Sequence, residues 1–128
     1  MAKLDKIVAF VATRNAAKAK EFYRGKLGLK FISDDGFALV FDIGGTMFRI
    51  ATVKDPVIAP YTVLGWEVQN IARAVSDLAK EGVVFEHFPG LQQDKAGIWT
   101  APSNDKVAWF KDPDGNLLSL SEHPGRKR

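Results

Sequence analysis

The side chains that could do acid–base or metal chemistry are few in this sequence. It has two histidines, His87 and His123, and no cysteine. The missing cysteines exclude disulfides, thiol nucleophiles and thiolate metal ligands. His87 ends a strand-like run and His123 stands beside Pro124 near the C-terminus, so we interpret both as surface histidines at strand ends. No Ser-His-Asp grouping, glycine-rich phosphate loop or zinc-protease motif is visible along the chain.

Asp112 and Asp114 form a pair of carboxylates that could serve general acid–base catalysis. They belong to a run, 109–120, in which two strand-forming segments flank Pro-Asp-Gly at 113–115. Proline pre-sets φ for a turn, aspartate can bond its own backbone, and glycine accepts positive φ. We therefore predict a β-hairpin here and assign both carboxylates to its turn.

The composition indicates an ordinary folded domain, because 46% of the 128 residues are hydrophobic and 26% are charged. No apolar run approaches the roughly 20 residues of a membrane helix, and the N-terminus lacks the apolar core of a signal peptide. The net charge of +3 owes much to residues 126–128, which we interpret as a solvated end. We expect a cytoplasmic protein whose partners include neither a membrane nor a nucleic acid.

The elements that must position any site begin with a strand and a helix. An apolar, β-branched run at 6–13 predicts a buried strand, and Asn15 is a good N-cap for a helix from Ala16 to about Leu27. Turn residues then separate three predicted strands, at 29–33, 37–43 and 46–53. This order is βαβββ, and two prolines within 54–60 mark a connector.

The second half of the chain repeats this plan. We predict a strand at 61–69, a helix over 71–81 capped by Asn70, a strand at 83–87 and the closing hairpin. The amino-acid sequence shows the repeat as well. Asn-Ala-Ala-Lys-Ala at 15–19 recurs as Asn-Ile-Ala-Arg-Ala at 70–74. Two copies of so long a unit indicate a duplicated module. Residues 88–104, which carry Trp99, are the least regular stretch and are expected to form a loop, either a functional lid or an insertion without a role.

Three motifs in this order carry a family resemblance. They are Phe-Tyr-x-x-x-Leu-Gly-Leu at 22–29, Ala-Lys-Glu-Gly-Val-x-Phe at 79–85 and Asp-Pro-Asp-Gly-Asn at 112–116. Together they resemble the vicinal oxygen chelate superfamily, which includes glyoxalase I, extradiol dioxygenases, fosfomycin-resistance transferases and bleomycin-resistance proteins. The resemblance implies an α+β fold, a single domain over 1–128 built from two βαβββ modules at about 1–55 and 60–123. These would form a curved, cup-shaped mixed sheet with helices on the convex face and the ligand on the concave face.

The resemblance also implies where a metal-dependent member would hold its ion. In glyoxalase I-like members the first strand of each module carries a His or Gln, and the last strand carries a Glu. The matching positions here hold Val8 and Val63, and Arg49 and Ser119. Two valines, a cation and a hydroxyl cannot make a divalent metal site. We therefore expect no metal and no cofactor, and we do not extend glyoxalase activity to this chain.

Strand parity predicts which side chains face the cup. If Val8 and Val63 point inward, every second residue of the same strands does too, and the other strands follow. The resulting surface is mostly apolar with a few polar groups, as small-molecule sites generally are. The expected ligand-binding residues are Phe10, Met47, Arg49, Glu67, Trp99, Trp109 and Ser119.

Four of these residues have two interpretations each. Arg49 and Glu67 are the only charges expected in the cup, so either they pair with each other or with neighbours as a buried structural bridge, or one of them anchors a charged or planar ligand. Trp99 and Trp109 either fill the core or form an aromatic wall against the ligand.

Three functions stay open, and we rank binding first. A metal-free protein resembling the bleomycin-resistance group would bind a small, largely apolar molecule in its cup. A metal-independent lyase-like or isomerase-like enzyme would use Glu67 as the candidate general base and Arg49 to stabilise an oxyanion. A non-catalytic assembly or regulatory subunit is the third possibility. Because half-cups of this superfamily commonly complete each other across a two-fold axis, we also expect a homodimer.

Overall fold

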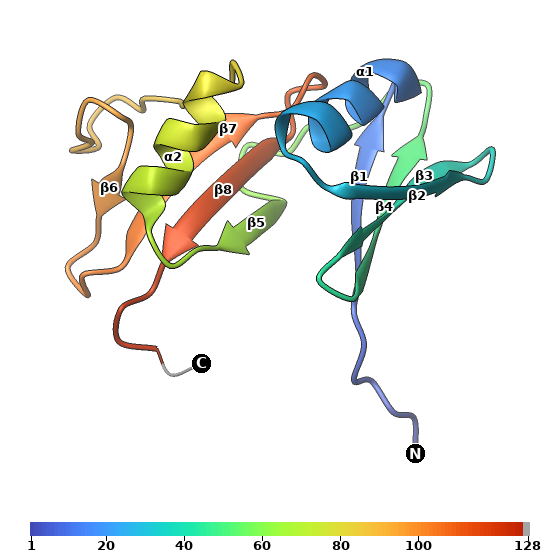
Figure 1. The fold of residues 1–128 in the computed structure, drawn as a ribbon, viewed down its shortest axis with the longest axis horizontal. Helices are drawn as coiled ribbons and strands as arrows, with labels where there is room; N and C mark the ends of the chain where they lie inside the picture. The colour runs from blue at the N-terminus through green and yellow to red at the C-terminus, as the bar shows by residue number, and fades with distance from the viewer. Residues whose placement is uncertain (127–128) are drawn as a thin grey trace. The chain divides into compact units, whose positions relative to one another are not determined.

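The computed structural model describes residues 1–126 and shows two compact units, the first over Met1–Ile58 and the second beginning at Ala59 (Figure 1). Each unit contains one four-stranded mixed sheet and one helical region. The α+β class and the two βαβββ modules are therefore confirmed. That the two modules make a single domain stays a prediction.

The sheet of the first unit has its first and last strands side by side. Its strands are β1 (Val8–Thr13), β2 (Lys30–Asp34), β3 (Ala38–Ile43) and β4 (Thr46–Thr52), in the order β1-β4-β3-β2. The pairing of β1 with β4 is parallel and the other two pairings are antiparallel. All four strands predicted for this module are present.

The helical region of the first unit differs from the single helix that was predicted. Helix α1 (Ala16–Lys20) begins after Asn15, whose side chain accepts a hydrogen bond from the backbone N–H of Lys18 at 3.1 Å. The chain then continues as a π-helical segment, η1 (Glu21–Lys26). Such wider turns shift the helical phase, and here the consecutive side chains Phe22 and Tyr23 are both buried.

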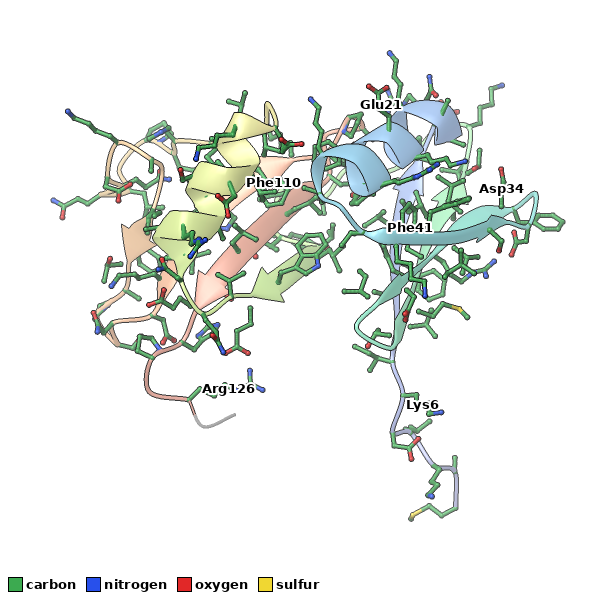
Figure 2. The ribbon with its side chains drawn as sticks, viewed as in Figure 1. Lys6, Glu21, Asp34, Phe41, Phe110 and Arg126 are labelled. Carbon is green, nitrogen blue, oxygen red and sulfur yellow. The ribbon has the colours of Figure 1, made fainter. Side chains whose placement is uncertain are left out.

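Aromatic rings make the core of the first unit. The Tyr23 ring lies 5.2 Å from that of Phe48, and the Phe41 ring lies 5.9 Å from that of Phe48. All three side chains are fully buried. Each such ring pair adds about 0.5–1.5 kcal/mol beyond the area it buries. Phe41, labelled in Figure 2, and Phe48 are register partners on β3 and β4, so this packing fixes the sheet face that meets the helix.

The sheet of the second unit repeats the topology of the first. Its strands are β5 (Leu64–Glu67), β6 (Trp99–Thr100), β7 (Lys106–Lys111) and β8 (Leu117–Glu122), in the order β5-β8-β7-β6. The β5–β8 pairing is parallel, as the β1–β4 pairing is. Helix α2 (Ile71–Lys80) begins after Asn70, whose side chain accepts from the backbone N–H of Arg73 at 3.1 Å. Within residues 1–126, no helix has the length and apolar character needed to cross a membrane.

The second strand of this module was predicted in the wrong place. The expected strand at 83–87 is reduced to a single bridge between Phe85 and Phe110, and β6 lies instead in the stretch predicted as a loop. The side chain of Gln93 accounts for part of this difference. Its amide donates to the carbonyls of Glu86 and Gly97 and accepts from the N–H of Phe88, at 2.7–2.9 Å, so a side chain replaces ladder bonds.

The hairpin between β7 and β8 has the turn that the sequence predicted. Asp112 Oδ1 accepts from the backbone N–H groups of Asp114 and Asn116, each at 2.9 Å, and Oδ2 accepts from the Asn116 side chain at 2.8 Å. Gly115 has a φ of 92°, which glycine adopts without strain. The Asp112 side chain is buried and serves the turn, as expected.

Close packing between β5 and β8 generates the first prediction. A Cβ atom at Gly65 would lie 2.6 Å from Ser119 Oγ but 3.9 Å from Ser119 Cβ. We expect Gly65→Ala to lower the free energy of unfolding by about 0.5–1.5 kcal/mol, because the Ser119 hydroxyl must rotate away from the new methyl group. In a Ser119→Ala background most of that cost should disappear. Chemical denaturation of both singles and the double measures this. Gly25→Ala, where a Cβ meets nothing within 4 Å, is the control, and an equal loss in both backgrounds would show that this register is wrong.

Candidate functional site

One face of each sheet carries no helix, and most of the expected site residues lie on these two faces. In the first unit, Phe48 and Ile50 are buried toward the helix, so Met47, Arg49 and Ala51 alternate onto the other side. The first helix-free face comprises Val8, Phe10 and Ala12 on β1, Ala38, Val40 and Asp42 on β3, and Met47, Arg49 and Ala51 on β4.

Large apolar side chains are exposed on this face. Phe10 is 59% exposed, Met47 44% and Val8 43%. Phe10 pairs in register with Arg49 and Val8 with Met47, so the four side chains form one contiguous patch. Burying a side chain of this size contributes roughly 1.5–3 kcal/mol. Asp42 on the same face pairs in register with Met47, and its Oδ1 accepts from the backbone N–H of Gly45 at 3.0 Å. The apolar patch beside the Arg49 cation is a surface suited to an apolar molecule with an anionic or carbonyl group.

The guanidinium of Arg49 is held by the turn between β2 and β3. Its Nη2 lies 2.6 Å from Asp35 Oδ2. The other carboxylate oxygen of Asp35 accepts from the backbone N–H groups of Phe37 and Ala38, at 3.0 and 2.9 Å. The hydrogen bond from Arg49, followed by those from Ala38 and Phe37, lowers the pKa of Asp35 from 3.8 to about 2. Asp35 therefore stays ionised at neutral pH and orients the cation.

The helix-free face of the second sheet is aromatic and polar. Register aligns Gly65 with Ser119 and Trp109, and the next row aligns Glu67 with Ser121 and Val107. Trp99 pairs with Val107 from β6. The second helix-free face comprises Gly65, Glu67, Trp99, Val107, Trp109, Ser119 and Ser121. It offers hydroxyls and a carboxylate beside indole rings.

The two tryptophans lie beside each other. Their ring centroids are 6.2 Å apart, and Phe88 meets Trp109 edge to face at 5.4 Å. Both tryptophans keep part of their surface exposed. The rings therefore pack on one another and still present a flat aromatic surface.

Glu67 forms an ion pair with Arg126, which follows β8. Its Oε1 lies 3.0 Å from Arg126 Nη1, and its Oε2 is buried. Of the pairings that the sequence left open, the structure shows pairing with neighbours, because Arg49 bonds to Asp35 and Glu67 to Arg126, each within its own unit. Figure 2 labels Arg126, which follows β8.

The positions that the family resemblance assigns to a metal do not fit one. Val8 and Val63 offer only carbon, the guanidinium of Arg49 is engaged by Asp35, and Ser119 supplies a single hydroxyl. Over the described part of the chain, no group of three or more His, Asp or Glu side chains could hold an ion. Divalent ions bind several converging N or O ligands, so these residues provide no such centre.

The structure brings the expected site residues together in two groups. Phe10, Met47 and Arg49 share the first helix-free face. Glu67, Trp99, Trp109 and Ser119 share the second. Sequence reasoning missed Asp35 and Arg126. Asp35 lies in the turn predicted between the strands at 29–33 and 37–43, so its position could have pointed to it. Nothing in the sequence indicates that Arg126 contacts Glu67.

Comparisons with known proteins agree on the fold. A putative glyoxalase family protein from Bacillus anthracis has a TM-score of 0.72 at 17% identity, with 96% of this chain and 98% of that chain covered. A glyoxalase family protein from Enterococcus faecalis has a TM-score of 0.68 at 22% identity, with 94% and 97% covered. A lactoylglutathione lyase from Agrobacterium tumefaciens has a TM-score of 0.68 at 16% identity, with 94% of both chains covered.

These identities establish a shared fold and leave activity open. No curated protein matches the chain in sequence. The family model described as Glyoxalase/Bleomycin resistance protein/Dioxygenase superfamily matches residues 3–120. That match spans both units and all three motifs noted in the sequence. The chain therefore belongs to the glyoxalase/bleomycin resistance protein/dioxygenase superfamily.

Proposed function

We propose that this protein binds a small, largely apolar molecule on its helix-free sheet surface without a resident metal, and that Arg49 anchors it. The observation that carries the proposal is the exposure of Phe10, Met47 and Val8 around an oriented guanidinium. Guanidinium is a planar fork of donors suited to carboxylates. The expected ligand is thus apolar with a carboxylate or a carbonyl group.

The pairing of Arg49 with Asp35 supports this role. The bond joins two partly exposed side chains, 27% and 39% accessible, so a ligand can reach the guanidinium. Exposed ion pairs contribute only about 0–1 kcal/mol to stability, and exchanging one carboxylate partner for another costs little. Asp35 therefore holds Arg49 in place until a ligand arrives.

The enzyme hypothesis has less support from the geometry. Its candidate base, Glu67, is engaged by Arg126 in an ion pair. An ion pair at 3.0 Å is the arrangement expected of a structural carboxylate. Binding is accordingly the function we propose.

A thermal-shift screen of small aryl carboxylates and carbonyl compounds tests the proposal. A ligand that binds only the native state raises the melting temperature. Arg49→Met should weaken binding by roughly 1.5–3 kcal/mol, the range for a charged hydrogen bond, while the fold is kept. Arg73→Met, on the exposed surface of α2, is the matched control. Adding Ni, Zn, Mn or Fe ions should leave the melting temperature unchanged. Equal binding by wild type and Arg49→Met would contradict the anchor.

The Asp35 carboxyl reports directly on Arg49. Because its pKa is lowered to about 2 in the folded protein, the stability it contributes is present above pH 3.8 and is lost as pH falls through 2. Arg49→Met should raise the pKa of Asp35 toward 3.8 without reaching it, since the N–H groups of Ala38 and Phe37 remain. NMR titration of the carboxyl carbon measures this, with Arg24→Met as control. A ligand that takes Arg49 should shift the same signal.

We further propose that the chain forms a homodimer. β1 and β2 are the edges of the first sheet, and β5 and β6 are the edges of the second. Open edges and exposed apolar side chains both favour association with a second copy. Light scattering at micromolar concentration should give about twice the 14.1 kDa chain mass. Phe10→Ser should shift the mass toward the monomer, whereas Val84→Ser, also exposed, should not. A monomer mass for wild type would refute this.

A further inference from the structure

Three side chains at the C-terminal end of the second unit form a chain of hydrogen bonds. Asp105 Oδ2 lies 3.0 Å from His123 Nδ1, and His123 Nε2 lies 2.9 Å from Ser121 Oγ. Both distances are within the range in which a catalytic base contacts its nucleophile and its orienting carboxylate. With the proton on Nδ1 donated to Asp105, Nε2 is left to accept the hydroxyl proton of Ser121.

The strand register explains why these residues meet. Lys106 on β7 pairs with Glu122 on β8, so Asp105 and His123 lie opposite each other one residue beyond that pair. Ser121 precedes His123 by two positions and shares its side of the strand. No Ser-His-Asp grouping is visible in the sequence because the carboxylate comes from the turn before β7, 16 positions before Ser121.

A tight turn presents the carboxylate. The N–H of Ala101 donates to the carbonyl of Asp105 at 2.8 Å, and the N–H of Asn104 donates to the carbonyl of Ala101 at 2.9 Å. Asn104 has a φ of 74°, and it is the single non-glycine residue with positive φ in the part of the chain that the structure describes. Asparagine tolerates this conformation better than most residues do.

A hollow of about 430 Å³ borders two members of the group, Asp105 and His123, and Ser121 is not among the residues that line it. It is lined by Ser103, Asp105, His123, Gly125 and Arg126. A hollow of this size admits a small ester. The Arg126 guanidinium has five N–H donors, and Glu67 engages it at Nη1, so it also supplies positive charge beside His123.

We propose that Ser121 is a nucleophile for acyl transfer, with His123 as its general base, Asp105 as the residue that orients the imidazole and small carboxylic esters as substrates. Ser121 Oγ bonds to the carbonyl carbon while its proton passes to His123 Nε2. The ester C–O bond then breaks, and His123 returns the proton to the leaving alkoxide. Water attacks the acyl-serine in the same way, which releases a carboxylic acid and restores Ser121. In this proposal Arg126, which lines the same hollow as His123, supplies positive charge for the oxyanion formed in each step.

This site is independent of the binding function proposed above. That proposal depends on the first helix-free face and on Arg49, whereas Ser121, His123 and Asp105 all belong to the second unit. Failure of either one leaves the other unaffected. The alternative is a purely structural role, in which these hydrogen bonds hold the segment after β8 against the turn before β7. Such a role would contribute stability but would not activate the Ser121 hydroxyl.

The decisive experiment is labelling of the full chain with a fluorophosphonate probe, followed by peptide mass spectrometry. An activated serine displaces fluoride and keeps the phosphonyl group. We expect one adduct, on Ser121. His123→Gln should slow labelling about 100-fold or more, since a positioned general base contributes about 10²–10⁴-fold. Asp105→Asn should slow it at least about tenfold, because the imidazole loses the partner that sets its tautomer.

Hydrolysis of p-nitrophenyl acetate provides the second readout. Turnover should follow the same order across the variants and should be lost in Ser121→Ala. Ser76→Ala, an exposed serine of α2, is the control and should behave as wild type in both assays. Melting curves establish that each variant is folded. The proposal would be overturned if wild-type protein gave no adduct on Ser121, or if His123→Gln left the labelling rate unchanged. The three side chains would then have a structural role only.

Discussion

The buried carboxylate of Asp112 is the interaction on which the second unit depends. The hydrogen bonds that it accepts from the backbone N–H of Asp114 and from the backbone and side chain of Asn116 fix the turn that joins β7 to β8. Because side chains alternate across a strand, a slip of one residue would turn Ser119 into the core and Leu118 out of it. Each buried hydroxyl without a partner would then cost about 1–3 kcal/mol. This turn therefore determines which side chains lie on the helix-free face of the second sheet.

The first unit reaches the same alternation by a different route. The packed rings of Tyr23 and Phe48 determine which face of the sheet meets the helix, and the turn between β2 and β3 then supplies Asp35 to the opposite face. In each unit one charged strand residue of the helix-free face is oriented by a residue outside the sheet. Arg49 is held by a turn residue and Glu67 by a residue beyond the last strand. The strands set the direction of these side chains, and the connecting segments set their electrostatics.

Local signals predicted most of the fold and the sides of its sheets. The caps Asn15 and Asn70 and the Pro-Asp-Gly turn act through neighbouring backbone, so sequence spacing reveals them. The π-helical segment could not be predicted, because it depends on how two aromatic side chains pack. Neither could β6, two residues whose pairing relies on β7 and on the loop that Gln93 holds. The partners of Arg49, Glu67 and His123 are long-range contacts without a local signature.

The repeated topology explains how the residues at the positions that the family resemblance assigns to a metal can vary without a change of fold. Val8 and Val63 belong to the first strand region of each unit, and Arg49 and Ser119 to the last. These positions alternate with the residues that form the cores, such as Phe48 and Leu118, both fully buried. Substitution on a helix-free face therefore changes the chemistry offered there and leaves the packing against the helix intact. Two faces of equal topology can in this way carry unlike chemistry, an apolar patch around a guanidinium on one and hydroxyls beside indole rings on the other.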